Sequence, residues 1–147
     1  MVKILVKKFD KKIKLPSYKT NGSSGMDLMA YIKKNIVIHP GEIAMIPTGI
    51  AIAIPKNYEI QIRPRSGLAI NNGISVLNTP GTVDSDYRGE LKIILINLSK
   101  KPFIVKSGDR IAQMVLCPIV KGKFKQVKIL PKTIRGKGGF GSTGKNN

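Results

Sequence analysis

The sequence predicts an all-β domain, a distorted jelly-roll or β-barrel with one short helix and a flexible C-terminal arm. About ten short apolar runs rich in Ile, Val and Leu recur along the 147 residues. Turn-forming residues separate these runs, with 15 Gly and 9 Pro in the chain. Several runs alternate apolar and polar residues with a period of two, as strands with one buried face do. Many short strands joined by Gly- and Pro-rich turns are typical of barrels and jelly-rolls.

The first part of the chain is expected to contribute an edge strand, a loop and an inner strand. Residues 2–15 alternate Lys with apolar residues, which predicts a short edge strand with lysines on its outer face. Residues 16–25 are rich in Ser, Thr, Asn and Gly and predict a loop. The apolar pattern resumes over 26–32, so Asp27 is expected just inside a strand.

The next apolar runs predict a hairpin and a further strand. Residues 36–38 are followed by His-Pro-Gly-Glu at 39–42, a turn signal, so 36–38 and 43–54 are expected to pair. Pro-Thr-Gly at 47–49 interrupts the second strand, after which Ile and Ala alternate with period two. Residues 58–63 alternate in the same way.

The middle of the chain predicts a helix and a central hairpin. Residues 66–72 are the plausible helix, with Ser66 as its N-cap. Apolar runs at 74–77 and 91–96 flank a turn-rich loop and predict a hairpin. Residues 81–91 hold three of the eight acidic residues of the chain and a tyrosine. Carboxylates are therefore expected at the mouth of this hairpin.

The last part predicts three more strands and then an arm. An apolar run at 103–105 leads into a turn, and the runs at 110–120 and 126–130 predict a long strand and a short one. Gly, Lys, Ser, Thr and Asn then dominate without periodicity, so this part cannot pack by itself. We therefore expect a β-domain over 1–131 and a flexible arm over 132–147.

The composition favours a soluble globular protein of the cytoplasm. The chain is 41% hydrophobic, contains no run of about 18 apolar residues, and begins with a Lys-studded segment unlike a signal peptide. A single cysteine, Cys117, excludes an intrachain disulfide and fits a reducing compartment. One Cys and one His cannot form a zinc ligand set, which excludes the zinc-dependent deaminases.

The net charge of +18 raises the question of nucleic-acid binding. Of the 26 basic residues, 21 are lysines scattered over every segment and five are arginines, all in Gly- or turn-rich segments. The planar arginine fork suits bidentate contacts with phosphate. Pairing with a carboxylate is the alternative for any single arginine, but the coincidence of all five with loops favours a polyphosphate site.

Five short segments stand out along the chain: SGMDLMA (24–30), RPRSGLA (63–69), GTVDSDYRGEL (81–91), RIAQM (110–114) and RGKGGFGSTG (135–144). In this order they resemble the five signature motifs of the homotrimeric deoxyuridine triphosphate nucleotidohydrolases (dUTPases). The chief departure is Ser24, where the family usually has alanine. The resemblance implies a homotrimer with active sites at its interfaces, which hydrolyses dUTP to dUMP and pyrophosphate with Mg²⁺. By the same resemblance, dUMP is expected to supply thymidylate synthesis, and removal of dUTP to keep uracil out of DNA.

The resemblance also implies a role for residues that bind phosphate or metal. Asp27 helps to hold, through water, the Mg²⁺ that accompanies the triphosphate, in keeping with the reluctance of this ion to dehydrate. Arg65, Ser66, Gly67 and the amide of Gln113 hold the α- and β-phosphates. Pairing at the start of a strand is the alternative for Asp27, and an ordinary capped turn is the alternative for residues 65–67.

The central hairpin is implied to hold the nucleoside and the catalytic base. Asn78 and the backbone of the hairpin read the edge of uracil, with backbone contacts from Gly81, Thr82, Val83 and Lys92. Tyr87 lies under the deoxyribose and leaves no room for a 2′-hydroxyl, while Asp84 activates the water that attacks the α-phosphorus. The structural alternatives are a turn-former at Asn78 and a cross-strand packing role for Tyr87. Arg88 is expected to brace the hairpin or a subunit contact.

The glycine-rich arm is implied to close over the bound nucleotide. Phe140 stacks on uracil, and Arg135, Ser142 and Thr143, with Gly141 between them, bind the γ-phosphate side. Residues 139–145 also match the phosphate-loop pattern G-x-x-x-x-G-K, but Asn146 follows where Ser or Thr is required. That pattern must also open a helix after a strand, so we reject it.

Two other functions stay open at this point. The dCTP deaminases share the fold, but the Asp-Ser-Asp-Tyr-Arg-Gly pattern at 84–89 and the complete fifth motif favour dUTP hydrolysis. A nucleic-acid-binding module would need aromatic platforms, and only 5% of the residues are aromatic. We expect nonspecific nucleic-acid binding at most, and no membrane partner.

Overall fold

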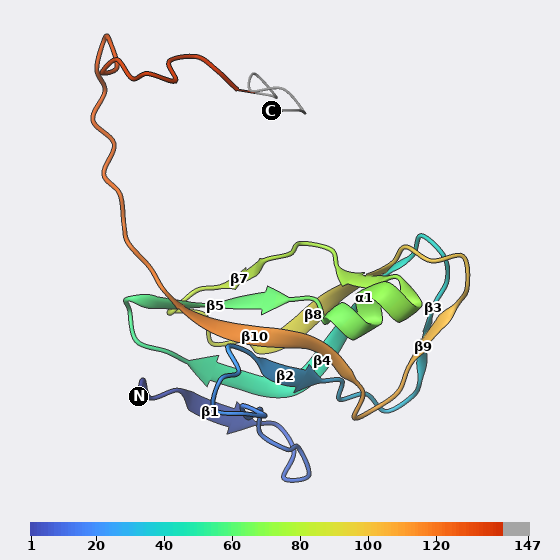
Figure 1. Cartoon of the computed structure of the whole chain (residues 1–147). Helices are drawn as coiled ribbons and strands as arrows, with labels where there is room; N and C mark the ends of the chain where they lie inside the picture. Colours follow the sequence, from blue (N-terminus) through green and yellow to red (C-terminus); the bar gives the residue numbers. More distant parts are fainter. Residues whose placement is uncertain (140–147) are drawn as a thin grey trace.

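The computed structural model describes residues 1–139, which form ten strands and one helix (Figure 1). In chain order they are β1 (Leu5–Lys8), β2 (Met26–Met29), β3 (Ile36–Ile38), β4 (Ile43–Ala53), β5 (Tyr58–Arg63), α1 (Ser66–Asn72), β6 (Ile74–Val76), β7 (Gly81–Val83), β8 (Glu90–Asn97), β9 (Phe103–Val105) and β10 (Arg110–Pro118). The predominance of short strands and the single short helix confirm the predicted fold class. No helix within this part of the chain has the length and apolar character needed to cross a membrane.

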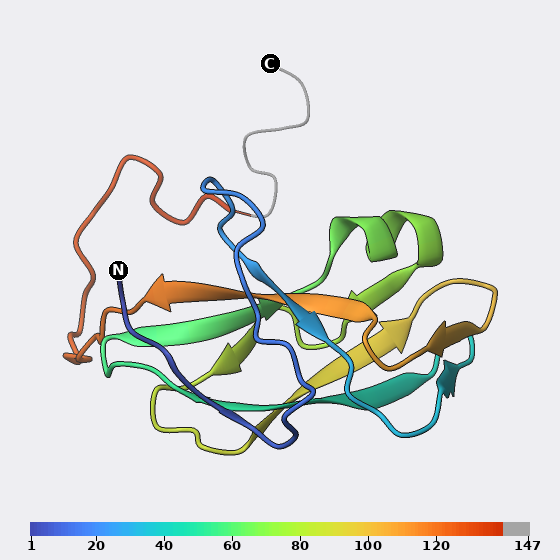
Figure 2. The same ribbon diagram turned by 90° about the horizontal axis from the view of Figure 1, so that it is seen from below.

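The strands form two four-stranded sheets and one two-stranded sheet. The first sheet has the order β1-β4-β8-β6, the second the order β2-β10-β5-β7, and β3 pairs with β9. All the pairings are antiparallel. In Figure 2 the β3–β9 pair lies at one end of the molecule, next to α1. Within residues 1–139 the sheets stay separate, so the fold is a jelly-roll-like sandwich and not one closed barrel.

The core lies between the two larger sheets because their strands alternate in burial. In β8, Leu91, Ile93 and Leu95 are buried, whereas the residues between them are more exposed. Ile46 of β4 and Ile60 of β5 are fully buried and belong to the same apolar cluster. Burying such side chains removes apolar surface from water, about 25 cal/mol per Å², which is the main driving force for this fold.

The outer face of the β4–β8–β6 sheet is also apolar. Ile43 lies opposite Ile96, and Met45 lies opposite Ile94, so these four side chains share one face. Ile43 is 56% exposed and Met45 is 59% exposed. Leu77, which follows β6 and donates its N–H to the carbonyl of Ile94, is 47% exposed. Contiguous exposed apolar patches of this kind mark interaction surfaces.

One predicted strand pairing, between 36–38 and 43–54, is wrong. The turn at 39–42 forms, with the N–H of Glu42 bonded to the carbonyl of His39, but it joins β3 to a strand of another sheet. The long β4 pairs instead with the long β8, because eight or more residues there offer more hydrogen bonds and more buried surface than three-residue β3. The predicted pairing of 74–77 with 91–96 is confirmed, because β6 pairs with β8. The loop between them contains an unpredicted strand, β7, which pairs with β5.

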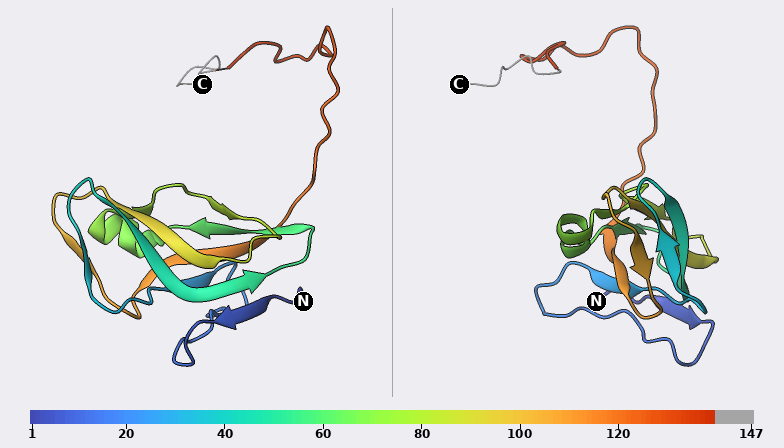
Figure 3. Two further views of the ribbon diagram at one scale, coloured as in Figure 1. Left: turned by 180° about the vertical axis from the view of Figure 1, so that it is seen from behind. Right: turned by 90° about the vertical axis from the view of Figure 1, so that its right-hand side faces the viewer.

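The strand predicted at 126–130 does not form, because no strand lies beside it within the described residues. The last backbone hydrogen bond to the body runs from Ile119 to Asn57. Beyond it the chain leaves the sandwich as an extended segment (Figures 1 and 3). Val120 and Phe124 on this segment are almost wholly exposed.

Candidate active site

The residues predicted to hold phosphate come from three neighbouring strands. In the sheet register Gln113 of β10 lies opposite Asp27 of β2 on one side and opposite Arg63 of β5 on the other. Beyond Arg63 the chain runs through Pro64 and Arg65 into α1. Directly paired residues lie about 5 Å apart. The carboxylate of Asp27, the amide of Gln113 and the start of α1 therefore lie close together near the end of β5.

Asp27 is held between two arginines. Arg65 Nε lies 3.1 Å from Asp27 Oδ1, and Arg110 Nη1 lies 3.2 Å from Asp27 Oδ2. Arg65 also donates from Nη1 to the carbonyl of Arg110, at 3.0 Å. The Asp27 side chain is only 18% exposed, so solvent screens these pairs less than pairs on an open surface. Asp27 thus fixes the orientation of both guanidinium groups.

The start of α1 leaves two predicted phosphate contacts open to solvent. Ser66 and Gly67 are exposed, and a Cβ atom at Gly67 would meet nothing within 4 Å. The prediction that Ser66 caps the helix is wrong, because Arg65 is the N-cap residue and no side chain caps the helix. The hydroxyl of Ser66 takes no part in capping and can meet a ligand.

Gln113 is fixed by a carbonyl and by a glycine. Its Nε2 donates to the carbonyl of Pro64 at 3.0 Å. A Cβ atom at Gly25 would lie 2.6 Å from Gln113 Oε1, so this position of the amide requires glycine at residue 25. Gln113 is half-buried between Ala112 and Met114, which are buried, in keeping with the polar role expected for it on an apolar strand.

The loop between β7 and β8 is stabilised mainly by its own hydrogen bonds. The N–H of Tyr87 donates to the carbonyl of Asp84 at 3.1 Å. Arg88 Nη1 donates to the carbonyls of Ser85 and Tyr87, at 2.7 and 2.8 Å. The hydroxyl of Tyr87 donates to the carbonyl of Glu90 at 3.0 Å. Arg88 therefore braces the loop, while the Asp84 side chain stays exposed.

A cavity of about 280 Å³ lies beside this loop, between β7 and β8. Five residues predicted to contact the nucleoside or the reacting phosphate line it: Thr82, Val83, Asp84, Tyr87 and Lys92. Next to it, Asn78 lies against the hairpin backbone, since a Cβ atom at Gly81 would be 3.1 Å from Asn78 Nδ2. The predicted nucleoside contacts are thus brought together.

The phosphate side and the nucleoside side do not meet within the described residues of one chain. A cavity of about 410 Å³ is lined by Arg65 and Arg110 and shares no residue with the nucleoside cavity. Val83 pairs with Ile60, three residues before the end of β5 at Arg63. At about 3.3 Å per residue, roughly 10 Å of strand separate the two sides, and the antiparallel β7 carries Asp84 still further away.

Among residues 1–139, the hydrogen bonds of the arm residue Arg135 are local. Its Nε donates to the carbonyl of Gly138 at 2.8 Å, and the N–H of Gly136 donates to Thr133 Oγ1 at 3.1 Å. Phe140, Gly141, Ser142 and Thr143 lie outside the described residues.

The donor set on the phosphate side fits Mg²⁺ that arrives with its ligand. Residues 1–139 contain no cluster of three or more His, Cys, Asp or Glu that could form a dedicated cage. Mg²⁺ is commonly bound by one or two carboxylates with waters and substrate phosphates. Each Asp27 oxygen keeps a lone pair beyond its arginine contact and can accept from a metal-bound water.

Two residues that the sequence reasoning left out of the site belong to its framework. Arg110 completes the Asp27 cluster, and its place at the start of the RIAQM segment was the available signal. Glu90 accepts the Gly49 N–H through Oε1 at 2.8 Å, and it is the third acidic residue of segment 81–91.

Comparison with known sequences identifies relatives over the whole domain. A family model described as dUTPase matches residues 11–144. The deoxyuridine 5′-triphosphate nucleotidohydrolase of Caldanaerobacter subterraneus subsp. tengcongensis is 58% identical over 134 residues, covering 91% of this chain and 90% of the relative. That of Rickettsia bellii is 55% identical over 145 residues, covering 98% and 97%.

Comparison with solved structures finds the same fold. The dUTPase of Staphylococcus bacteriophage 80alpha, solved with dUPNHPP, has a TM-score of 0.82 and 28% identity over 97% of this chain and 98% of that chain. A variant dUTPase of phage phi11 of S. aureus, whose structure describes the coordination of a structural Mg(II) ion, has a TM-score of 0.79 over 88% of this chain and 99% of that chain. At 23% identity it shows the fold alone.

Proposed function

This chain belongs to the dUTPase family, whose members hydrolyse dUTP, and on that premise we propose how its own residues carry out the reaction. A water molecule attacks the α-phosphorus of dUTP, the bond from that phosphorus to the α–β bridging oxygen breaks, and dUMP and pyrophosphate leave. The attack needs a carboxylate to take the proton of the water, cations to disperse charge on the leaving group, and a pocket for the nucleoside.

Asp84 is the proposed general base, and its position carries the proposal. Its carboxylate is exposed and lines the nucleoside cavity together with Tyr87. Both salt bridges of residues 1–139 are made by Asp27, so no ion pair in this part of the chain competes for Asp84. A carboxylate at hydrogen-bond distance from a bound water can orient it in line with the leaving oxygen.

The α- and β-phosphates bind, in this proposal, to Arg65, Ser66, Gly67 and Gln113. Arg65 offers a planar fork held in place by Asp27, and Ser66 and Gly67 offer an exposed hydroxyl and backbone amides. A guanidinium fixed before the ligand arrives costs less side-chain entropy on binding, which is why the Asp27 pair supports the assignment.

Asp27 also has a proposed part in metal binding, through metal-bound water. Bound Mg²⁺ would neutralise charge on the triphosphate oxygens. Asp27 itself would accept hydrogen bonds from the waters of that ion, while it keeps Arg65 aimed at the phosphates.

Specificity for uracil and deoxyribose is proposed to come from the hairpin. Asn78 and the backbone at 81–83 and Lys92 form hydrogen bonds with the base edge, and buried polar groups reject a base that leaves them unpaired. Tyr87 lies under the sugar and excludes a 2′-hydroxyl.

We assign the working enzyme as a homotrimer with shared sites. Support comes from the separation of the two cavities and from the exposed apolar face that carries Ile43, Met45 and Leu77. Met45 also lines the nucleoside cavity, so a subunit covering this face would bring its own phosphate side near Asp84. The β-domain over 1–131 would then act with the arm, 132–147, of another subunit, which brings Arg135 and residues 140–143 over the ligand.

The proposed biological role is the supply of dUMP for thymidylate synthesis and the exclusion of uracil from DNA, in the cytoplasm. The deciding experiment is pyrophosphate release from dUTP with Mg²⁺, run beside dTTP, dCTP and UTP. Release from dUTP alone supports both the reaction and the pocket, and ammonia release from dCTP would indicate deamination. No release from any of the four nucleotides would refute the proposed function.

A further inference from the structure

The active-site loop between β7 and β8 is tied to the rest of the protein through an irregular stretch of β4. Pro47 pairs with Lys92 and Ala51 pairs with Glu90, so three β4 residues face the single residue Leu91. The backbone in this stretch bulges away from regular pairing. Its middle residue, Gly49, has a φ of 70°, which favours glycine.

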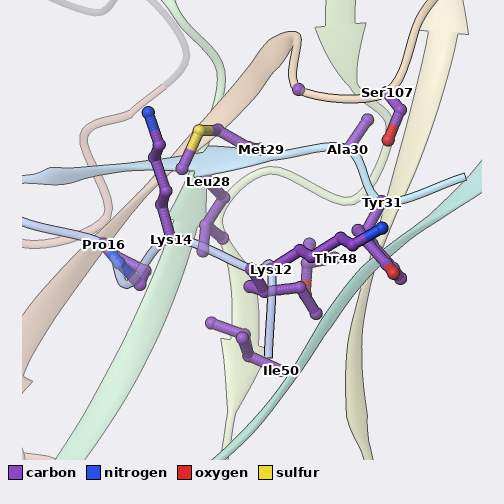
Figure 4. Close-up of a pocket in the computed structure, with 12 residues that line it drawn as sticks. Lys12, Lys14, Pro16, Leu28, Met29, Ala30, Tyr31, Thr48, Ile50 and Ser107 are labelled. Carbon is purple, nitrogen blue, oxygen red and sulfur yellow. The ribbon is translucent and has the colours of Figure 1, made fainter. Parts of the chain in front are cut away.

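Two side-chain hydrogen bonds cross from this bulge to the start of β8. Thr48 Oγ1 donates to the carbonyl of Leu91 at 2.6 Å, and the N–H of Gly49 donates to Glu90 Oε1 at 2.8 Å. Thr48 is 3% exposed, so its bond is shielded from water. Behind it, a cavity of about 320 Å³ is lined by Thr48, Ile50 and Tyr31 (Figure 4). Regular sheet pairing supplies neither of these two bonds.

Glu90 connects the β4 bulge to the nucleoside side of the site. Its carboxylate accepts from the bulge, and its carbonyl accepts from the hydroxyl of Tyr87. Most other bonds of the loop join residues of the loop to one another. The ring of Tyr87 also lies directly on Gly89, where a Cβ atom would overlap the Tyr87 side chain.

We infer that Glu90 is a positioning residue that, through its bond to the β4 bulge, sets the place of Tyr87 and hence discrimination between deoxyribose and ribose. The inference rests on the proposed function, in which Tyr87 lies under the sugar. Glu90 acts through Tyr87 and Gly49 and takes no part in the chemical step. The bond needs an acceptor oxygen at Oε1 and no negative charge.

The test compares Glu90→Ala with Glu90→Gln, because the amide of Gln keeps the acceptor oxygen and loses only the charge. Steady-state kinetics with dUTP and UTP should show that Glu90→Ala raises KM for dUTP about five-fold, the size of one net hydrogen bond. The ratio of kcat/KM for dUTP over UTP should fall by a similar factor, with a smaller change in kcat. Glu90→Gln should stay within about two-fold of the unaltered enzyme in each quantity.

A role in stability alone predicts a different outcome. Partial unfolding of Glu90→Ala would lower the active fraction and thus the apparent kcat, with KM and the dUTP/UTP ratio unchanged. That pattern, or equal defects in Glu90→Ala and Glu90→Gln, would overturn the inference. Thr48→Val, which removes the neighbouring tether and keeps the volume, should lower the ratio in the same direction.

Hydrogen exchange of the ligand-free protein tests the bond between Gly49 and Glu90 without reference to activity. The Gly49 amide and the peptide containing Tyr87 should exchange faster in Glu90→Ala and not in Glu90→Gln. Unchanged exchange in Glu90→Ala would contradict the positioning role of Glu90 even if dUTP is the substrate. Faster exchange in Glu90→Ala, together with no dUTP hydrolysis by the unaltered protein, would refute the proposed function and still support the positioning role of Glu90.

Discussion

Gly25 and Gln113 are packed so closely that a single methyl group on Gly25 would lie 2.6 Å from Gln113 Oε1. The amide of Gln113 can then donate to the carbonyl of Pro64 and face the start of α1. A small residue just before β2 thus determines where a polar side chain of β10 lies, on the phosphate side of the site.

Gly25→Ala should therefore weaken nucleotide binding while the fold survives. The far end of Gln113 is flexible and can move aside, at the expense of its bond to Pro64, which contributes about 1 kcal/mol. KM for dUTP should rise about five-fold. Gly22→Ala is the matched control in the same loop, because a Cβ atom there meets nothing within 4 Å. Equal kinetics for the two variants would argue against a phosphate contact from Gln113.

Asp27→Asn should misplace the arginines and change the response to metal. The variant loses the charge that holds Arg65 and Arg110, so KM for dUTP should rise about ten-fold. The Mg²⁺ concentration for half-maximal rate should rise with it. A Mg²⁺ titration at fixed dUTP measures this, and an unchanged titration midpoint would show that Asp27 acts on the arginines alone.

Asp84→Asn should bind dUTP and lose most turnover. Loss of a general base typically costs 10²–10⁴ in rate, whereas Asn keeps the shape and one acceptor oxygen. Calorimetric dissociation constants should stay within a few-fold, while single-turnover rates fall by at least about 100-fold. Asp86→Asn, in the same exposed loop, is the control and should stay close to full activity. Near-normal turnover in Asp84→Asn would refute the base assignment.

The Tyr31–Asp10 hydrogen bond predicts a pH dependence of stability. The hydroxyl of Tyr31, and next the N–H of Lys12, hold the pKa of Asp10 below its ordinary value, while the same bond raises the pKa of Tyr31. Since the folded pKa of Asp10 lies below its unfolded value of about 3.9, its contribution is present above that pH. It is lost as the pH falls through the folded pKa.

At the alkaline end the sign is reversed. The contribution of Tyr31 is present below about pH 10 and is lost as the pH rises through its folded pKa. Tyr31→Phe removes the main cause of both shifts, so its thermal midpoint should change less than that of the unaltered protein between about pH 5 and 2. Tyr18→Phe, at an exposed tyrosine, is the control. Identical pH profiles for the unaltered protein and Tyr31→Phe would contradict the coupling.

The sequence predicts strand positions in this protein better than strand partners. Alternation of apolar residues located β4 and β5, because burial of one face produces a local period of two. A short apolar run located β8. Pairing depends on residues far apart, so the turn at 39–42 was mistaken for a hairpin although β3 pairs with β9. The predicted strand at 126–130 failed for the same reason, since apolar residues form a strand only where a neighbour supplies hydrogen bonds.

Within the site, motifs identified residues but not the contacts between them. The resemblance of segment 81–91 to a family motif pointed to Asp84 and Tyr87, which line one cavity. The ion pair of Arg110 with Asp27 joins residues 83 positions apart, and the hydrogen bond from Gly49 to Glu90 joins residues 41 positions apart. No local sequence pattern indicates either contact.

Removal of the arm after Lys132 should abolish dUTP hydrolysis while leaving the trimer intact. The apolar outer face around Met45 lies in the body, so we expect assembly through this face to proceed without residues 133–147. The truncated protein loses Arg135 and the predicted contacts at 140–143. The triphosphate is then open to water and lacks the cation predicted to bind its γ-phosphate.

Sedimentation should give the same trimer mass, less three arms. Turnover should fall by at least about 100-fold, as for other catalytic closures that position charge. Arg135→Ala in the full chain separates the charge of Arg135 from the rest of the arm. The turnover of this variant should lie between those of the truncated and the unaltered proteins. A truncated trimer with full activity would show that the arm has no part in the mechanism. A truncated protein that is monomeric would show that the arm acts in assembly.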